Sequence, residues 1–70
     1  MADLYEIRVR GHLSDDWSEW LGGATIGNLP DGEAVLRCEV ADQSALHGLL
    51  ARLRDLNVPI VHVVRVAPQQ

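Results

Sequence analysis

The sequence has no phenylalanine, only one cysteine and few basic residues. A single cysteine cannot form an intramolecular disulfide, and no cysteine pair with metal-ligand spacing is present. Six Lys plus Arg against ten Asp plus Glu give a formal net charge of −4. This balance argues against non-specific nucleic-acid binding, which needs a basic face. Without phenylalanine, the core must be built from Leu, Val, Ile, Ala and two Trp.

Long apolar runs are also missing. The longest, residues 58–64, is interrupted by Pro59 and His62 and is far too short to span a bilayer. Residues 1–10 contain no basic segment followed by an apolar run, so no signal peptide is expected. We therefore predict a cytoplasmic protein with no membrane partner.

The residues that are present indicate one folded domain over residues 1–70. Hydrophobic residues make up 47% of the chain and charged residues 23%, a composition that differs from that of disordered segments. A domain of this size buries only about 60% of its unfolded surface. Because no disulfide or metal can act as a staple, we expect a homo-oligomer.

Alternation of apolar and polar residues predicts strands. The first strand is predicted over residues 4–10, where Tyr5, Ile7 and Val9 fall on one face and the charged residues 6, 8 and 10 on the other. Residues 33–40 alternate in the same way, with the even-numbered side chains apolar. A weaker strand over residues 24–29 precedes them across the turn formed by residues 30–32, and residues 58–66 form the last strand.

Two helices are expected between these strands. Ser14 and the acidic pair after it are typical of a helix start, Trp17 and Trp20 share one stripe, and two glycines end the helix. A longer helix begins at a cap, Asp42 or Ser44, and runs to about residue 56. Its leucines recur at the spacing of an amphipathic helix.

This order predicts an α+β, ferredoxin-like split βαβ fold (β-α-β-β-α-β). Two strand-helix-strand units joined by a hairpin give a four-stranded antiparallel sheet with both helices on one face. Right-handed crossovers place the first and third strands in the centre.

The sheet face without helices decides which functions are available. It displays charged residues of the central strands, and the last strand adds either His62 and Val64 or Val61, Val63 and Arg65. Both sets are largely apolar, so we expect a second copy on this face or on the last strand's edge. The predicted interface consists of Arg8, Arg37, Glu39 and His62. The alternative is a solvated face with ordinary cross-strand pairs. Recognition of RNA would need aromatic residues there, and charged ones occupy the positions.

The loop after the first strand is the candidate ligand site. In a split βαβ domain this loop and the helix start that follows it form a natural binding site. Its candidate residues are Gly11, His12, Asp15, Asp16 and Trp17. Alternatively, the acidic pair only caps the helix, and the tryptophans only dock it on the sheet. The three histidines lie on different elements, so no metal site is predicted. Cys38, on an apolar strand face, is expected to fill the core.

Two resemblances to known proteins accompany this interpretation. The opening residues 5–11 and the helical segment 42–56 resemble a group of short uncharacterised bacterial proteins, which implies a stand-alone cytoplasmic protein and no activity. Residues 28–32 resemble the Asn-x-x-Asp-Gly hairpin of acylphosphatase, and residues 9–11 resemble the entry to its phosphate loop. The second resemblance implies that Asn28 orients an attacking water. The loop here has no arginine to hold a phosphate and carries two acids instead.

The function predicted from the sequence is a non-enzymatic homodimeric module for ligand sensing or protein interaction, with no cofactor. Its partners are a second copy and a small molecule or another protein. One alternative is a degenerate acylphosphatase-like hydrolase that uses Asn28. Another is an adaptor for a larger protein, with an apolar and accessible open face.

Overall fold

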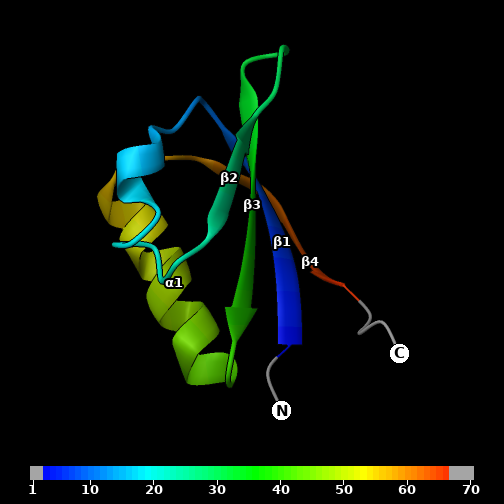
Figure 1. Cartoon of the computed structure of the whole chain (residues 1–70), viewed down its shortest axis with the longest axis vertical. Coiled ribbons are helices and arrows are strands. Elements are labelled where there is room, and N and C mark those ends of the chain that lie inside the picture. Colours follow the sequence, from blue (N-terminus) through cyan, green and yellow to red (C-terminus); the bar gives the residue numbers. More distant parts are fainter. Residues whose placement is uncertain (1–2, 67–70) are drawn as a thin grey trace.

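The computed structural model describes residues 3–66. Its strands form a four-stranded antiparallel sheet in the order β2-β3-β1-β4. The helical segments lie on one side of this sheet (Figure 1). The elements are β1 (Asp3–Arg10), the 3-10 helix η1 (Asp15–Trp17), β2 (Thr25–Asn28), β3 (Glu33–Val40), α1 (Gln43–Asp55) and β4 (Ile60–Val66). The central position of β1 and β3 agrees with the expectation from the sequence.

Strand register determines which residues share a face. β1 and β3 pair without interruption from Asp3↔Val40 to Arg10↔Glu33. β4 pairs with β1, and a bulge after His62↔Arg8 leaves Val61 without a partner. Because directly opposed residues point to the same side, His62 and Val64 lie on the sheet face away from α1. The first of the two alternatives for the last strand is therefore confirmed.

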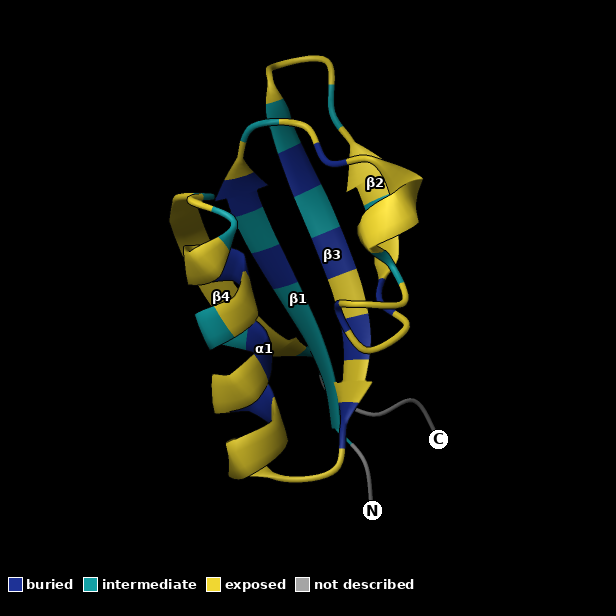
Figure 2. Ribbon diagram, turned by 90° about the vertical axis from the view of Figure 1, so that its left-hand side faces the viewer, coloured by how far each residue is buried: buried dark blue, intermediate teal, exposed yellow. Residues whose placement is uncertain are grey.

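The core lies between the sheet and α1. Buried positions alternate along β1 and β3, as the period of two in the sequence predicts (Figure 2). α1 contributes three leucines of its apolar stripe. The fully buried large side chains are Ile7, Val9, Leu21, Leu36 and Leu53. In the described part of the chain, no polar or charged residue is buried.

α1 begins and ends at residues that the sequence singles out. Asp42, not Ser44, is the N-cap, and its Oδ1 accepts a hydrogen bond from the Ala45 N–H at 2.8 Å. At the other end Arg52 and Arg54 occupy the last turn, where positive charge suits the helix dipole. Asn57 then adopts a left-handed conformation (φ 60°), which ends the helix.

The prediction of a ferredoxin-like fold with two helices is wrong, because α1 is the one α-helix of residues 3–66. The segment predicted to form the first helix is a single 3-10 turn followed by further turns. Its hydrogen bonds mostly span three residues, as from the Ser18 N–H to Asp15 (3.0 Å) and from the Gly22 N–H to Glu19 (3.1 Å). Too few residues separate the Ser14 cap from the two positive-φ glycines to complete a stable α-helix. The protein is a small, sheet-rich α+β fold.

The tryptophans do not dock this segment on the sheet, contrary to expectation. Trp17 and Trp20 are 39% and 40% exposed, and their rings stack edge to face with centroids 5.7 Å apart. The buried anchors of the segment are instead Leu13, Leu21 and Ala24. The η1 segment therefore covers part of the sheet beside α1, held by these three side chains.

Candidate functional site

The predicted ligand loop is tied to the β2–β3 turn. The N–H of Gly11, a residue with φ 114°, donates to the Gly32 carbonyl at 2.8 Å. His12 Nε2 donates to the Leu29 carbonyl at 2.7 Å. Asp15, Asp16 and Trp17 follow on η1, where they are exposed. The five candidates are near each other in the chain, but none of them lines either of the two grooves described below.

Asn28 is also held by this loop. Its Oδ1 accepts from the Leu13 N–H at 2.9 Å, and its Nδ2 donates to the Leu13 carbonyl at 3.0 Å. The side-chain amide thus pairs with the N–H and the carbonyl of Leu13 as the backbone of a neighbouring strand would. This pairing joins β2 to the loop after β1. These bonds use one of the two Oδ1 lone pairs and one of the two Nδ2 hydrogens, so each atom keeps capacity for one further partner.

The described residues hold no group of three or more His, Cys, Asp or Glu side chains that could bind a metal. The histidines lie on the β1–η1 loop, on α1 and on β4. Cys38 is a buried free thiol on the helix side of β3. Burial raises its pKa through desolvation, so the reactive thiolate is disfavoured.

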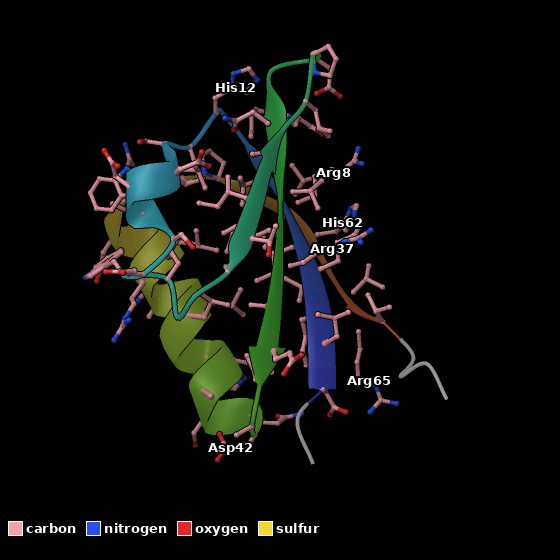
Figure 3. The ribbon with its side chains drawn as sticks, in the orientation of Figure 1. Arg8, His12, Arg37, Asp42, His62 and Arg65 are labelled. Atoms are coloured by element: carbon pink, nitrogen blue, oxygen red, sulfur yellow. The ribbon has the colours of Figure 1, made fainter. Side chains whose placement is uncertain are left out.

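The predicted interface residues lie on the open face, defined as the side of the sheet away from α1. Arg8, Arg37 and His62 all project from this side in Figure 3. Arg8 forms an ion pair with Glu33 (3.4 Å), and Arg37 forms one with Glu6 (3.2 Å). Such partly exposed pairs contribute about 0–1 kcal/mol each. The Arg8 Nε is buried without a hydrogen-bond partner in the described structure.

β4 is apolar and exposed on both sides. Ile60 and Val63 face the helix side and are 38% and 36% exposed, and Val64 on the open face is 48% exposed. Val61, at the bulge, is 44% exposed. Among residues 3–66 the strand hydrogen-bonds to β1 alone, and no strand of this range pairs with its outer edge. The sequence predicted apolar side chains on both sides of this strand but not how far they are exposed.

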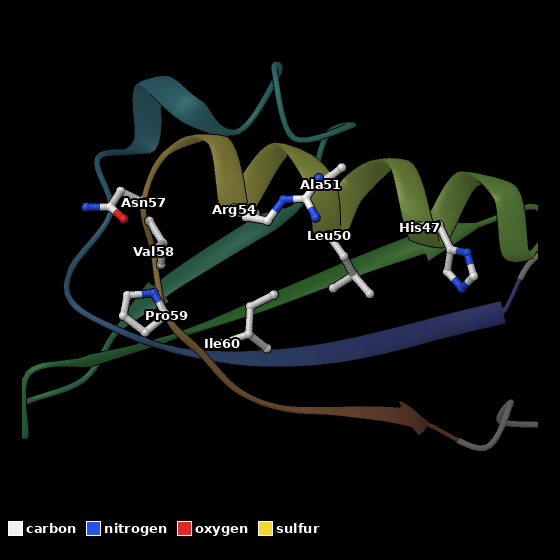
Figure 4. A pocket seen from close by; sticks show the side chains of 8 residues that line it. All are labelled: His47, Leu50, Ala51, Arg54, Asn57, Val58, Pro59 and Ile60. Atoms are coloured by element: carbon white, nitrogen blue, oxygen red, sulfur yellow. The ribbon is translucent and has the colours of Figure 1, made fainter.

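A groove runs between α1 and the start of β4 (Figure 4). Its volume is about 580 Å³, within the range of about 300–1,000 Å³ that is usual for binding pockets. It is lined by His47, Leu50, Ala51, Arg54, Asn57, Val58, Pro59 and Ile60. Sequence reasoning missed this groove. The available signal was the helical spacing of residues 47, 50, 51 and 54, next to the buried leucine stripe.

A second, smaller groove of about 300 Å³ flanks the other side of α1. Its lining includes Cys38, Leu49 and Arg52, and it adjoins the turn that replaces the predicted first helix. The Arg52 guanidinium lies 5.6 Å from the centre of the Trp20 ring and donates a hydrogen bond to the Trp20 carbonyl. This contact joins α1 to the turn at the edge of the second groove.

Comparison with known proteins identifies the family. A family model described as a domain of unknown function (DUF8691) matches residues 4–64. The chain belongs to this family. No curated protein and no solved structure matches the chain. The DUF8691 match extends from β1 into β4, so the open face and both grooves are built by the family domain. Within residues 3–66, no helix is long and apolar enough to cross a membrane.

Proposed function

We propose that this domain is a non-enzymatic, cytoplasmic protein-interaction module that forms a homodimer through the open face of its sheet. The observation that carries the proposal is the exposure of Val64, 48% on a sheet face that α1 does not cover. Large apolar side chains at the margin of an uncovered sheet mark interaction surfaces. His62 lies beside Val64 on β4, so the predicted interface residues adjoin this apolar margin.

The charges of the open face suit a two-fold contact. Two ion pairs, Arg8 with Glu33 and Arg37 with Glu6, place positive and negative groups side by side on this face. Glu39 is exposed on the same face and belongs to none of the three ion pairs in residues 3–66. A surface with mixed signs can complement a rotated copy of itself.

The binding free energy of a dimer needs contributions from both the apolar and the charged residues of the open face. Removing the exposed half of a valine from water contributes about 1 kcal/mol, and every residue occurs twice in a two-fold dimer. A micromolar dissociation constant corresponds to about −8 kcal/mol. Val64 and the half-buried Val35, Leu4 and Val66 therefore supply part of this free energy. The paired charges fix the orientation of the two copies.

Protein interaction is favoured over small-molecule sensing. The loop predicted to bind a ligand has His12 hydrogen-bonded to Leu29 and Asn28 hydrogen-bonded to Leu13. These hydrogen bonds support the fold, and Asn28 also borders a hollow of about 440 Å³ on the open face. Arg8 and Arg37, which line this hollow, are already held in ion pairs with Glu33 and Glu6, so the face suits a protein surface better than a small ligand.

Sedimentation equilibrium over a range of protein concentrations tests the dimer. We expect the mass to rise from the 7.7 kDa protomer to twice that value by low micromolar concentration. Val64→Asp places a charge in the contact and should return the protein to a monomer. Ala41→Asp, which adds the same charge at an exposed position between β3 and α1, should leave the dimer intact. A 7.7 kDa species of the wild type at every concentration would overturn the proposal.

A further inference from the structure

We propose that the outer edge of β4 and the adjoining α1–β4 groove bind an extended, acidic-apolar peptide segment of a partner protein, which adds to the sheet as a fifth strand. This inference rests on the proposed protein-interaction function and names the partner's chemistry. Strand addition uses backbone hydrogen bonds for affinity and alternate side-chain pockets for specificity. The structure provides both elements on the same side of the molecule.

The two edges of the sheet differ in their fitness for this role. β2 has only four residues, with Thr25, Gly27 and Asn28 exposed. β4 has seven residues, and five of them are valine or isoleucine. Exposed edges are normally shortened, charged or covered, because their unpaired N–H and C=O groups attract other strands. β4 carries one charged residue, Arg65, and a bulge at Val61, but it is longer and more apolar than β2 and is therefore the better acceptor for a strand.

The groove supplies side-chain contacts next to that edge. Leu50, Val58 and Ile60 form an apolar floor between α1 and β4 (Figure 4). Side chains of an added strand alternate between the two faces of the sheet, with about 6.5–7 Å between those on one face. Every second residue of the peptide would therefore point to the helix side, where the groove lies.

Charge identifies what the peptide must carry. His47 and Arg54 line the groove, and no acidic side chain lines it. Arg54 belongs to none of the three ion pairs in the described range 3–66. Arg54 brings a positive charge and His47 a hydrogen-bonding imidazole to this groove of a chain whose net charge is −4. A carboxylate on the peptide would complement them, and an arginine fork binds a carboxylate strongly.

The same argument selects a partner over a second copy of β4. The strand from Ile60 to Val66 contains His62 and Arg65 but no acidic residue. Pairing β4 with itself would bring no acidic side chain from the strand to His47 and Arg54. The open face therefore accounts for the dimer, and the edge with its groove remains for a segment of opposite charge.

The test is fluorescence anisotropy with labelled heptapeptides, which match the seven residues of β4. A Val-Glu peptide, in which Val and Glu take turns at every second position so that both face the groove and Thr fills the other positions, should bind. The matched Val-Lys peptide should bind at least tenfold more weakly. A Val-Glu peptide N-methylated at every amide has no N–H to donate on either edge and should not bind. If the methylated peptide binds equally well, or if no Val-Glu binding occurs at millimolar concentration, the inference is wrong.

Variants of the protein locate the site. Arg54→Glu should weaken Val-Glu binding by at least tenfold, and Leu50→Asp should abolish it. Arg52→Glu is the matched control, because Arg52 lines the groove on the other side of α1, and it should leave the affinity unchanged. Equal affinity of the wild type and Arg54→Glu would remove the groove from the proposal.

The dimer and the peptide site can fail separately. Sedimentation of Arg54→Glu should still show the dimer, and Val64→Asp should still bind the Val-Glu peptide. Loss of peptide binding with an intact dimer overturns only the present inference. If unlabelled Val-Glu peptide dissociates the wild-type dimer, a second copy occupies the β4 edge and the assignment of that edge to a partner peptide is wrong.

Discussion

Asn28 and Leu13 are joined by two hydrogen bonds that run in opposite directions between the side-chain amide and one peptide unit. Asn28 ends β2, and Leu13 lies in the loop after β1 with its side chain buried. These elements are separated by the whole η1 turn in the sequence. The pair therefore positions Leu13 in the core and closes the η1 segment over the sheet.

Asn28→Ala should lower the free energy of unfolding by about 1–2 kcal/mol, because two hydrogen bonds with modest net value are lost. Asn28→Asp keeps the acceptor for the Leu13 N–H but sets a carboxylate oxygen against the Leu13 carbonyl, so it should cost at least as much. Urea unfolding measures both values. Equal stability of all three proteins would mean that the pair contributes nothing.

The same variant bears on the hydrolase alternative. We expect no turnover of an acyl phosphate by the wild type, because the loop lacks an arginine and carries two acids instead. A phosphate-release assay checks this directly. Turnover that is lost in folded Asn28→Ala would restore the acylphosphatase-like interpretation.

Leu53→Ala should be among the most destabilising single changes in α1. Leu53 is 0% exposed, and truncation of a fully buried leucine costs about 2–5 kcal/mol. Domains of this length have about 4–10 kcal/mol in total, so a large unfolded fraction is expected. Leu50→Ala, at a half-buried groove position, should cost about 1 kcal/mol. Similar urea midpoints for the two variants would contradict this ranking of the two sites.

Cys38 should react slowly with thiol reagents in the native protein. Its burial raises the pKa of the thiol, so the folded state holds the proton more tightly than the unfolded state does. This contribution to stability is complete below the unfolded pKa of the thiol. It is lost as pH rises through the folded pKa, so the wild type should lose stability in the alkaline range.

Cys38→Ala isolates that effect. In the alkaline range the unfolding free energy of Cys38→Ala should depend less on pH than that of the wild type. Near neutral pH the two free energies should vary with pH in the same way. Thiol labelling with and without urea measures the protection of the thiol. Fast labelling of the native wild type would show that Cys38 is accessible.

Arg52→Ala should loosen the η1 turn without disturbing the sheet. It removes the guanidinium over the Trp20 ring and the hydrogen bond to the Trp20 carbonyl, at a cost of about 1 kcal/mol. The near-UV circular dichroism of the tryptophans should weaken. Arg54→Ala removes the same charge from the opposite side of α1, and its tryptophan signal should equal that of the wild type.

The strands could be predicted from the sequence because the period of two is a local signal. β3 occupies residues 33–40 as predicted, and β2 lies within the predicted residues 24–29. β4 begins at Ile60, two residues later than predicted, because Pro59 has no N–H to donate to a ladder. The cap at Asp42 needed the structure, since Asp42 and Ser44 both fit the pattern.

The prediction of a first helix was wrong for a reason that the local sequence pattern does not reveal. Ser14, which caps η1, and the apolar spacing of Trp17 and Trp20 all match a helix, and the side chain of Ser14 does accept the N–H of Asp16 at 3.2 Å. Nucleation of a helix has a cost that a segment this short cannot offset. The outcome depends on Leu13 and Leu21 reaching the core, which is a tertiary contact.

The candidate site likewise has one part that the sequence predicts and another part that it does not. The open-face residues could be predicted, because alternation along β1 and β3 assigns each residue to a side. The α1–β4 groove could not, since it exists only because α1 packs beside β4 without covering it. The hydrogen bonds of His12 and Asn28 are equally long-range, and no spacing in the sequence indicates them.

The unequal ends of the sheet also limit how large any assembly can grow. A segment that joins at β4 finds no comparable acceptor at β2, which is too short and too polar to recruit another chain. If a segment joins at β4, we therefore expect strand addition to stop after one segment per protomer rather than to continue into a fibril.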